Sequence, residues 1–386
     1  MTSRGRRWGS LGGRSAPHLL VVGAIILGTL VALETGARLV VYGNDAWRPD
    51  YRESADGYGG APWVGRYYKE FRDSGDVDWH PYVYWRRRPY SGEYINVDAE
   101  GVRRSWRAAN LPALAPAVFV LGGSTVWGTG ARDEQTMPSQ IARQLDGRGR
   151  PVRIVNYGES GYVLRQSLDT VIDRLQRGDV PRVAVFYSGV EDTFSALQNG
   201  EPGLPQNEAN RRLEFNATQP QNLDKLWHVM TAGVERLGSL ARARLVPSAA
   251  AQDARAGGDR PGLADSVVAT YCSTARVAAA LGRQYGFAVK FYWQPVLFMK
   301  ASPTAYEAGA RERYGYARDF FDQVYTRMSR PGACADVEIT DLSHLFDRET
   351  QPRYIDAFHL TEAGNEAVAG AIVPDVASVL DVAEAK

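Results

Sequence analysis

Four short segments of the sequence place chemically active residues directly after buried strands or before a helix. They are VFVLGGSTVWGTG (118–130), IVNYGESGY (154–162), VFYSGVEDT (185–193) and YIDAFHLTEAGNEAVA (354–369). In the first, a strand runs into glycines and Ser124, a position that presents the serine hydroxyl and its own N–H at the edge of a sheet. In the last, Asp356 can accept a hydrogen bond from one ring nitrogen of His359 and leave the other free to take a proton from a serine. These patterns predict a nucleophilic serine site.

The first and last segments each have another interpretation. A glycine-rich turn between a strand and a helix can hold phosphate, but no lysine follows Ser124 as it does in a P-loop. Asp356 and His359 could merely cap the final helix. The second and third segments favour the catalytic interpretation, because Gly161 could aim a free N–H into the same cleft and Gly189 ends a strand just before a pair of acidic residues.

The order GGST, NYGESGY, SGVEDT and DAFHLTEAGN resembles the SGNH (GDSL-type) hydrolase superfamily over residues 116–380. The resemblance implies a flavodoxin-like three-layer α/β/α sandwich with a parallel sheet. It also implies Ser124 as the nucleophile, His359 as the general base and Asp356 as its orienting partner, with the N–H groups of Ser124 and Gly161 in the oxyanion hole. The N-terminal anchor and aromatic arm described below are similar to a bacterial membrane-anchored branch of that superfamily.

One position departs from the pattern of this superfamily. Its third block carries Gly-x-Asn-Asp, whereas this chain has Glu191 in place of the asparagine that supplies an amide donor to the oxyanion. An ionised carboxylate there would repel the oxyanion, and loss of one donor costs about 100- to 1,000-fold in rate. Three outcomes are open. Glu191 is held protonated by burial and donates, it turns away while another donor such as Asn156 serves, or the domain binds without turnover.

Alternating strands and helices are predicted from residue 116 onward. Short apolar runs at 117–121, 152–157, 183–187 and 288–293 alternate with helical segments such as 138–145 and 167–176, and 361–380 closes the chain. This alternation is typical of a parallel sheet covered on both faces, in which ligands bind beyond the carboxyl ends of the strands. We therefore expect residues 116–386 to form one α/β domain, interrupted by an insertion at 198–265. A helical pattern at 223–240 within the insertion predicts a packed helix, a lid or a membrane-resting helix.

Residues 43–115 have a different composition from the rest of the chain. Fourteen of the 68 residues from 43 to 110 are Trp, Tyr or Phe, against 11% for the whole chain. Arginines are interleaved with them, among them Arg66, Arg72, Arg86, Arg87, Arg88, Arg103 and Arg104. Such a mixture can bind sugars by stacking, but we expect an extracytoplasmic arm without much regular structure that lays its aromatic side chains on the following domain. The run Arg86–Arg88 could face acidic lipid or an anionic glycan, and we expect it to be solvated or paired.

The N-terminus predicts a membrane location. An apolar run at 19–33, extended by residues to 42, follows a basic segment at 1–18 that contains Arg4, Arg6, Arg7 and Arg14. This arrangement keeps the N-terminus in the cytoplasm and sends the rest of the chain across the bacterial cell membrane. Glu34 and Arg38 lie four apart on one helical face and can pair. We expect residues 19–42 to form one uncleaved transmembrane helix anchored in the bilayer, with a signal cleaved near 35–37 as the alternative.

Composition excludes several classes of function. The 45 basic and 44 acidic side chains leave a net charge of +1, too little basic excess for a nucleic-acid partner. The histidines show no shared ligand spacing, so we expect no metal and no other cofactor. In an oxidising compartment Cys272 and Cys334 can form a disulfide, which closes a loop of about 60 residues and contributes roughly 4 kcal/mol. Two buried free thiols are the alternative.

The sequence thus leads to two candidate functions. The first is a membrane-tethered extracytoplasmic serine esterase or O-acyltransferase, acting on an O-acetyl ester of an envelope or exported polysaccharide. Hydrolysis and transfer differ only in whether water or another acceptor enters the site. The alternative is a catalytically impaired glycan-binding or scaffolding protein, which the substitution at Glu191 favours.

Overall fold

The computed structural model describes residues 16–47, 49–217, 231, 234, 237–238 and 262–384. The chain divides into two compact units, one of residues 1–48 and 210–249 and the other of residues 49–209 and 250–386. The helix predicted at 223–240 lies almost entirely outside the described residues.

The first unit contains the N-terminal helix α1 (Ala16–Trp47). Its stretch Leu20–Val40 is long and apolar enough to cross a membrane and is almost wholly exposed. Arg38 donates to Glu34 at 2.8 Å, as their spacing predicted.

The second unit is built on a five-stranded parallel sheet with the order β6-β5-β7-β8-β9. Its strands are β5 (Ala117–Gly122), β6 (Arg153–Asn156), β7 (Val183–Ser188), β8 (Ala288–Trp293) and β9 (Ile339–Asp341). Counted along the chain this is the order 2-1-3-4-5 of flavodoxin-like folds, and the strand order reverses between β5 and β7. The short strand β9 had not been predicted.

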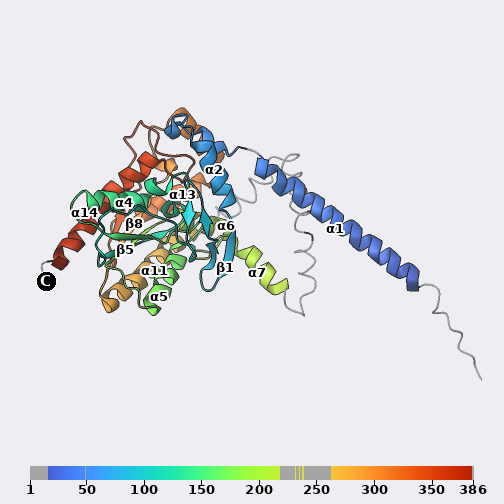
Figure 1. The fold of residues 1–386 in the computed structure, drawn as a ribbon, viewed down its shortest axis with the longest axis horizontal. Helices are drawn as coiled ribbons and strands as arrows, with labels where there is room; N and C mark the ends of the chain where they lie inside the picture. The colour runs from blue at the N-terminus through green and yellow to red at the C-terminus, as the bar shows by residue number, and fades with distance from the viewer. Residues whose placement is uncertain are drawn as a thin grey trace, which may run out of the picture. The chain divides into compact units, whose positions relative to one another are not determined.

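Helices cover both faces of the sheet, as Figure 1 shows for α4 and α14 on one side and α5 and α11 on the other. The helices of this unit are α2 (Val64–Asp73), α3 (Ser124–Trp127), α4 (Met137–Asp146), α5 (Leu164–Gln176), α6 (Val190–Asn199), α11 (Leu263–Tyr285), α12 (Ala305–Arg313), α13 (Gly315–Met328) and α14 (Glu362–Glu384). Helix α7 (Glu208–Ala217) follows α6 and includes residue 209, the last residue of this unit before the division between the two units. Short 3-10 helices lie at Tyr51–Ser54 (η1), Asp56–Tyr58 (η2), Asp133–Gln135 (η3) and Leu297–Met299 (η4).

Period-two alternation along the strands sends their side chains into two separate cores. Phe119 and Leu121 of β5 pack in the core that includes α5, α11 and α13, whereas Val118 and Val120 pack in the core that includes α4 and α14. A strand buried on both faces reads as a continuous apolar run. The structure is therefore the expected three-layer α/β/α sandwich with a parallel sheet.

Residues 49–115 pack in the same compact unit as the sheet, with more regular structure than predicted. They contain α2 and two antiparallel pairs, β1 (Val77–His80) with β2 (Tyr84–Arg87) and β3 (Tyr90–Ser91) with β4 (Asn96–Val97). The expected aromatic anchoring is present, since Tyr67 and Tyr68 are fully buried in a third core cluster. A bridge between Arg103 and Asn156 places this segment along the edge strand β6, which protects that edge from pairing with other chains.

Candidate active site

The predicted site residues follow strands that end at the point where the strand order reverses. Ser124 begins α3 directly after β5, and Glu191 lies in the first turn of α6 directly after β7. A Cβ at position 123 would lie 1.8 Å from Oε1 of Glu191, so any residue other than glycine there would displace the Glu191 carboxyl group. The glycines of the first segment thus allow the backbone before Ser124 to approach the side chain that follows the neighbouring strand.

Ser124, His359 and Asp356 form one continuous hydrogen-bonded chain. Nε2 of His359 lies 2.7 Å from Oγ of Ser124, and Nδ1 lies 2.7 Å from Oδ2 of Asp356. Oδ1 of Asp356 also accepts the backbone N–H groups of Phe358 at 2.9 Å and His359 at 2.7 Å. A carboxylate only accepts, so Nδ1 carries the proton and Nε2 of the neutral ring is the acceptor for the serine hydroxyl.

Asp356 is held ionised although it is buried. Burial alone would raise its pKa, but the charge of His359, the hydrogen bonds from His359 and the nearby Arg52 cation together lower the pKa to about 2. Nη1 of Arg52 lies 3.5 Å from Oδ2 of Asp356, and Asp50 holds the same guanidinium through bonds of 2.9 and 2.7 Å. Arg52 was not among the predicted site residues, because no spacing rule connects it to a carboxylate about 300 residues away.

Glu191 faces the serine directly. Its Oε1 accepts the backbone N–H of Ser124 at 2.9 Å and lies 3.1 Å from the serine hydroxyl oxygen, while the buried Oε2 has no hydrogen-bond partner. Burial raises the pKa of Glu191, and the hydrogen bonds that it accepts and the charge of His359 oppose the rise. The Ser124 N–H, expected to stabilise an oxyanion, is therefore occupied by a carboxyl group that burial drives toward its neutral form.

Gly161 and Asn156 have different positions relative to this site. Gly161 lines the same cavity as Ser124 with a φ of +78°, and no hydrogen bond of its N–H is found within the described residues. Asn156 does not line that cavity, because its amide donates to the carbonyl of Trp127 at 3.4 Å and accepts from the N–H of Gly158 at 3.0 Å. The structure therefore contradicts the alternative in which Glu191 turns away and Asn156 replaces it.

A cavity of about 270 Å³ surrounds the serine. Its polar lining includes Arg52, Ser124 and His359, and its apolar lining comes from Phe71, Val190, Phe194, Tyr314 and Phe358. Arg52 and Phe71 belong to the arm, so residues on both sides of position 115 build the wall. A small group bound beside Ser124 would contact residues of both the arm and the sandwich.

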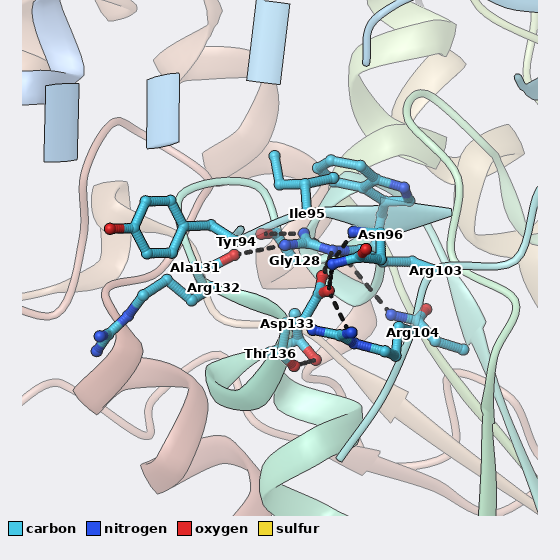
Figure 2. Close-up of polar contacts among 12 residues, drawn as sticks. Tyr94, Ile95, Asn96, Arg103, Arg104, Gly128, Ala131, Arg132, Asp133 and Thr136 are labelled. Atoms are coloured by element: carbon cyan, nitrogen blue, oxygen red, sulfur yellow. Dashed lines mark hydrogen bonds and ion pairs between the residues drawn. The ribbon is translucent and has the colours of Figure 1, made fainter. Parts of the chain in front are cut away.

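The arm also supports the loop that follows the nucleophile. Figure 2 shows the Arg103 guanidinium surrounded by its partners, with Asp133 at 2.9 Å and the carbonyls of Gly128 and Ala131 at 2.8 and 2.7 Å. The Trp127 ring lies between two arginines, with the guanidinium carbon of Arg87 3.9 Å and that of Arg103 4.2 Å from its centroid. These contacts hold the segment 127–133, at the carboxyl end of the short helix α3 that begins with Ser124.

The three arginines of the 86–88 run are all paired. Arg86 is buried and donates to Thr170, and Arg87 is buried and forms an ion pair with Glu159 at 3.4 Å. Arg88 is exposed and bonds Asp78 at 2.8 Å. None of the three forms a free cationic surface.

Cys272 of α11 and Cys334 form a disulfide. The bond joins a helix of the sandwich to the segment that leads into β9.

Comparisons with known proteins give similarity in structure only. Searches of the sequence against family models and against curated proteins find no match. One similar solved structure is the acetyl xylan esterase AlAXEase, at 13% identity and a TM-score of 0.39, with 67% of this chain and 99% of that chain covered. Another is a member of the lipolytic protein G-D-S-L family from Veillonella parvula, at 12% identity and a TM-score of 0.33, with 66% of this chain and 93% of that chain covered.

A third similar structure is Axe2, an acetylxylan esterase from Geobacillus stearothermophilus, at 12% identity and a TM-score of 0.33, with 68% and 94% of the chains covered. The chain is thus similar to solved lipolytic proteins of the G-D-S-L family and to acetylxylan esterases.

Proposed function

We propose that this protein is a serine esterase or O-acyltransferase that uses Ser124, His359 and Asp356. The observation that carries the proposal is the hydrogen-bonded chain from Asp356 through His359 to Ser124, with both links at 2.7 Å and the serine in a cavity. An activated serine requires a neutral base beside it and a third group that orients the base. These three side chains meet that requirement.

The reaction follows from the donor and acceptor roles of these groups. Oγ of Ser124 attacks the ester carbonyl carbon while its proton passes to Nε2 of His359, and the ionised Asp356 stabilises the imidazolium. Nε2 then gives the proton to the departing alcohol oxygen, which leaves the acyl group on Ser124. Water or an acceptor hydroxyl attacks this acyl-serine and passes its own proton to Nε2, and the serine hydroxyl is restored as the product leaves.

The developing oxyanion requires donors other than the N–H of Ser124. In this proposal the Gly161 N–H supplies one, and the neutral carboxyl group of Glu191, which lines the cavity, supplies the other. A carboxylic acid that burial keeps neutral can donate a hydrogen bond to the oxyanion. The asparagine side-chain amide that the family resemblance would place at this position donates in the same way. Glu191 is then a functional replacement for asparagine.

Labelling with a fluorophosphonate tests the nucleophile. We expect the reagent to add to Ser124 of the folded protein, and Ser124→Ala to remove both the adduct and hydrolysis of p-nitrophenyl acetate. Thr125→Ala, which changes the neighbouring hydroxyl, serves as the matched control and should keep both. Turnover retained in Ser124→Ala would remove Ser124 from the mechanism.

The pH profile tests Glu191. Activity should fall at high pH as Glu191 ionises through its raised pKa, and Glu191→Gln should remove that fall while it keeps activity at neutral pH within about threefold. Glu191→Asn should raise the neutral-pH rate, because the shorter amide side chain would release the Ser124 N–H that Glu191 occupies. A high-pH fall that persists unchanged in Glu191→Gln would exclude the neutral-acid role.

The substrate and location are further parts of the proposal. The apolar stretch Leu20–Val40 supports a membrane anchor, or alternatively a signal sequence, with the sheet domain on the extracytoplasmic side. The small cavity supports a short acyl group such as acetyl, and tethering at the cell surface supports an O-acetylated envelope or exported polysaccharide as the carrier. Mass spectrometry of the mature N-terminus distinguishes an anchor from a cleaved signal.

A second candidate is a glycan-binding protein of the same fold without efficient turnover. The contact that favours it is the hydrogen bond from the Ser124 N–H to Glu191, which occupies an expected oxyanion donor. Absence of a fluorophosphonate adduct on the folded protein would support this candidate.

A further inference from the structure

Two aromatic side chains of the arm are exposed, whereas the others are buried or half-buried. Trp79 keeps 68% and Tyr82 keeps 85% of its surface exposed, whereas Tyr67 and Tyr68 are fully buried. Both exposed residues lie in the hairpin formed by β1, β2 and the turn between them. Packing of the arm on the sheet therefore does not account for these two large rings.

The backbone of the same turn adopts a conformation that disfavours such residues. Tyr82 and Tyr84 have φ values of +66° and +74°. Glycine and asparagine adopt this left-handed region readily, whereas a bulky side chain is strained there. Strained positions of this kind are concentrated at binding sites, where the side chain serves a ligand.

The exposed Trp79 ring lies against the half-buried ring of Tyr84. The rings of Trp79 and Tyr84 are stacked, with centroids 5.2 Å apart and an interplanar angle of 29°. Tyr82 lies between them in sequence at the turn. We call Trp79, Tyr82 and Tyr84 the hairpin platform.

The hairpin platform is attached to the rim of the cavity that contains Ser124. Trp79 pairs across the hairpin with Trp85, whose indole N–H donates to the carbonyl of Ser160 at 3.0 Å. Ser160 and Gly161 both line the cavity, and a Cβ at Gly161 would lie 3.5 Å from the Trp85 ring. A chain-like ligand that occupies the cavity at this rim would meet the hairpin next.

Further contacts hold the hairpin in place. The Gln166 side chain donates to the carbonyl of Val83 at 2.7 Å, and the hydroxyl of Tyr162 donates to the carbonyl of Trp85. Both donors belong to the segment around the start of α5. The platform is thus pre-organised, which reduces the entropy cost of binding.

We propose that the hairpin platform binds sugar units of a polysaccharide whose acyl ester lies in the cavity. The C–H face of a pyranose ring is flat and apolar and stacks on aromatic rings, while its hydroxyls bond polar groups such as Asp78 and His80 of β1. A membrane surface is the other partner of exposed aromatic rings, but the exposed Arg88 of this hairpin is paired with Asp76 and Asp78, so it does not supply a basic cluster that attracts anionic lipid. The inference rests on the proposed function for the role of the cavity and gives that site its substrate class.

Sugar titration of the full chain in lipid nanodiscs tests this inference. The probes are hexasaccharides of xylose, N-acetylglucosamine and mannuronate. The variants are Trp79→Ala and Tyr82→Asn. The control is Tyr285→Ala, because Tyr285 is an exposed aromatic residue at the opposite, amino-terminal edge of the sheet. We expect at least one hexasaccharide to bind, with a dissociation constant raised about tenfold in Trp79→Ala and unchanged in Tyr285→Ala. Hydrolysis of p-nitrophenyl acetate should be unchanged in all three, because this small ester does not reach the platform.

Tyr82→Asn separates a binding role from a structural one. Asparagine tolerates the left-handed backbone, so this variant should melt about 2 °C or more above the wild type while it binds the hexasaccharide more weakly. Weaker binding in a more stable protein is not expected from damage to the fold.

Three outcomes would overturn the inference. The first is that the wild-type protein hydrolyses the small ester but binds none of the hexasaccharides. The second is that wild type and Trp79→Ala bind sugar with equal affinity. The third is that spin-labelled lipid quenches the fluorescence of the wild type but not of Trp79→Phe, while no sugar binds. Sugar binding that depends on Trp79, in a protein that neither hydrolyses the ester nor reacts with fluorophosphonate, would support the platform and reject the enzyme.

Discussion

Two neighbouring carboxyl groups, Glu191 and Asp192, are buried in the first turn of α6. Asp192 accepts the backbone N–H of Leu164 at 3.0 Å through Oδ1, and its Oδ2 has no hydrogen-bond partner. Burial, together with the nearby Glu191, raises the pKa of Asp192 to about 7 against the opposing hydrogen bond from Leu164. Burial thus shifts the ionisation of both carboxyl groups to higher pH than on an exposed surface, so the charge beside the nucleophile changes with pH.

Asp192 predicts a pH dependence of stability. Its folded-state pKa of about 7 exceeds its ordinary value of 3.8, so the folded state holds the proton more tightly than the unfolded state. The free energy of unfolding should therefore fall as pH rises from about 4 to 7, by up to about 1.4 kcal/mol per pH unit. Urea unfolding of wild type and Asp192→Asn at pH 5, 6, 7 and 8 should show that the variant loses less stability over this range.

Asparagine can keep the acceptor for Leu164 and cannot ionise, so the two proteins should be closest in stability at pH 5. Glu134→Gln, at an exposed position, serves as the control and should follow the wild type. Parallel curves for wild type and Asp192→Asn would show that Asp192 does not titrate as described.

At the scale of elements, the arm and the sandwich share one site. Arg52 of η1 contacts Asp356, Phe71 of α2 lines the cavity, and Arg103 binds the loop after α3. The arm therefore carries part of the machinery, in addition to its packing role.

Arg103→Met tests the contribution of the arm. Both side chains of the Arg103 and Asp133 ion pair are buried, and the substitution would also leave the carbonyls of Gly128 and Ala131 without this donor. We expect the free energy of unfolding to fall by about 3–5 kcal/mol, as measured by urea denaturation. Arg165→Met breaks the largely exposed pair with Asp169 and should cost less than about 1 kcal/mol. A cost for Arg103→Met as small as that of the control would contradict the proposed supporting role.

The whole molecule consists of two compact units, and every site residue named above lies in the unit of residues 49–209 and 250–386. The apolar stretch Leu20–Val40 lies in the other unit. The apolar stretch and the candidate active site are therefore carried by different parts of the chain.

Truncation before residue 49 tests this separation. A protein that begins at Pro49 should be soluble without detergent and hydrolyse p-nitrophenyl acetate with a kcat/KM within about threefold of the full chain, because Asp50 and Arg52 remain. A protein that begins at Gly59 lacks both residues and should lose at least about tenfold in kcat/KM, since Asp356 loses its cation. Equal activity of the two truncated proteins would show that Arg52 does not act on the site.

The sequence by itself determined the layered fold and the residues brought together at its edge. Continuous apolar runs at 117–121 and 183–187 predicted strands buried on both faces, and Asp356 and His359 are close in sequence, so local geometry governs their hydrogen bond. In a parallel sheet the carboxyl ends of neighbouring strands share one edge, which brought Ser124 toward Glu191. These conclusions depend only on periodicity, local spacing and the direction of the strands.

Only the tertiary structure decided which groups face the nucleophile and which aromatic residues are exposed. Glu191 lies on the Ser124 N–H, Arg52 reaches Asp356 across about 300 residues, and Trp79 is exposed while Tyr67 is buried. These are contacts between segments distant in the chain, so their distances depend on the packing of helices and loops that no local pattern encodes. Burial in that packing also sets the pKa of Glu191, because the same carboxyl group ionises at its ordinary pH on an exposed surface.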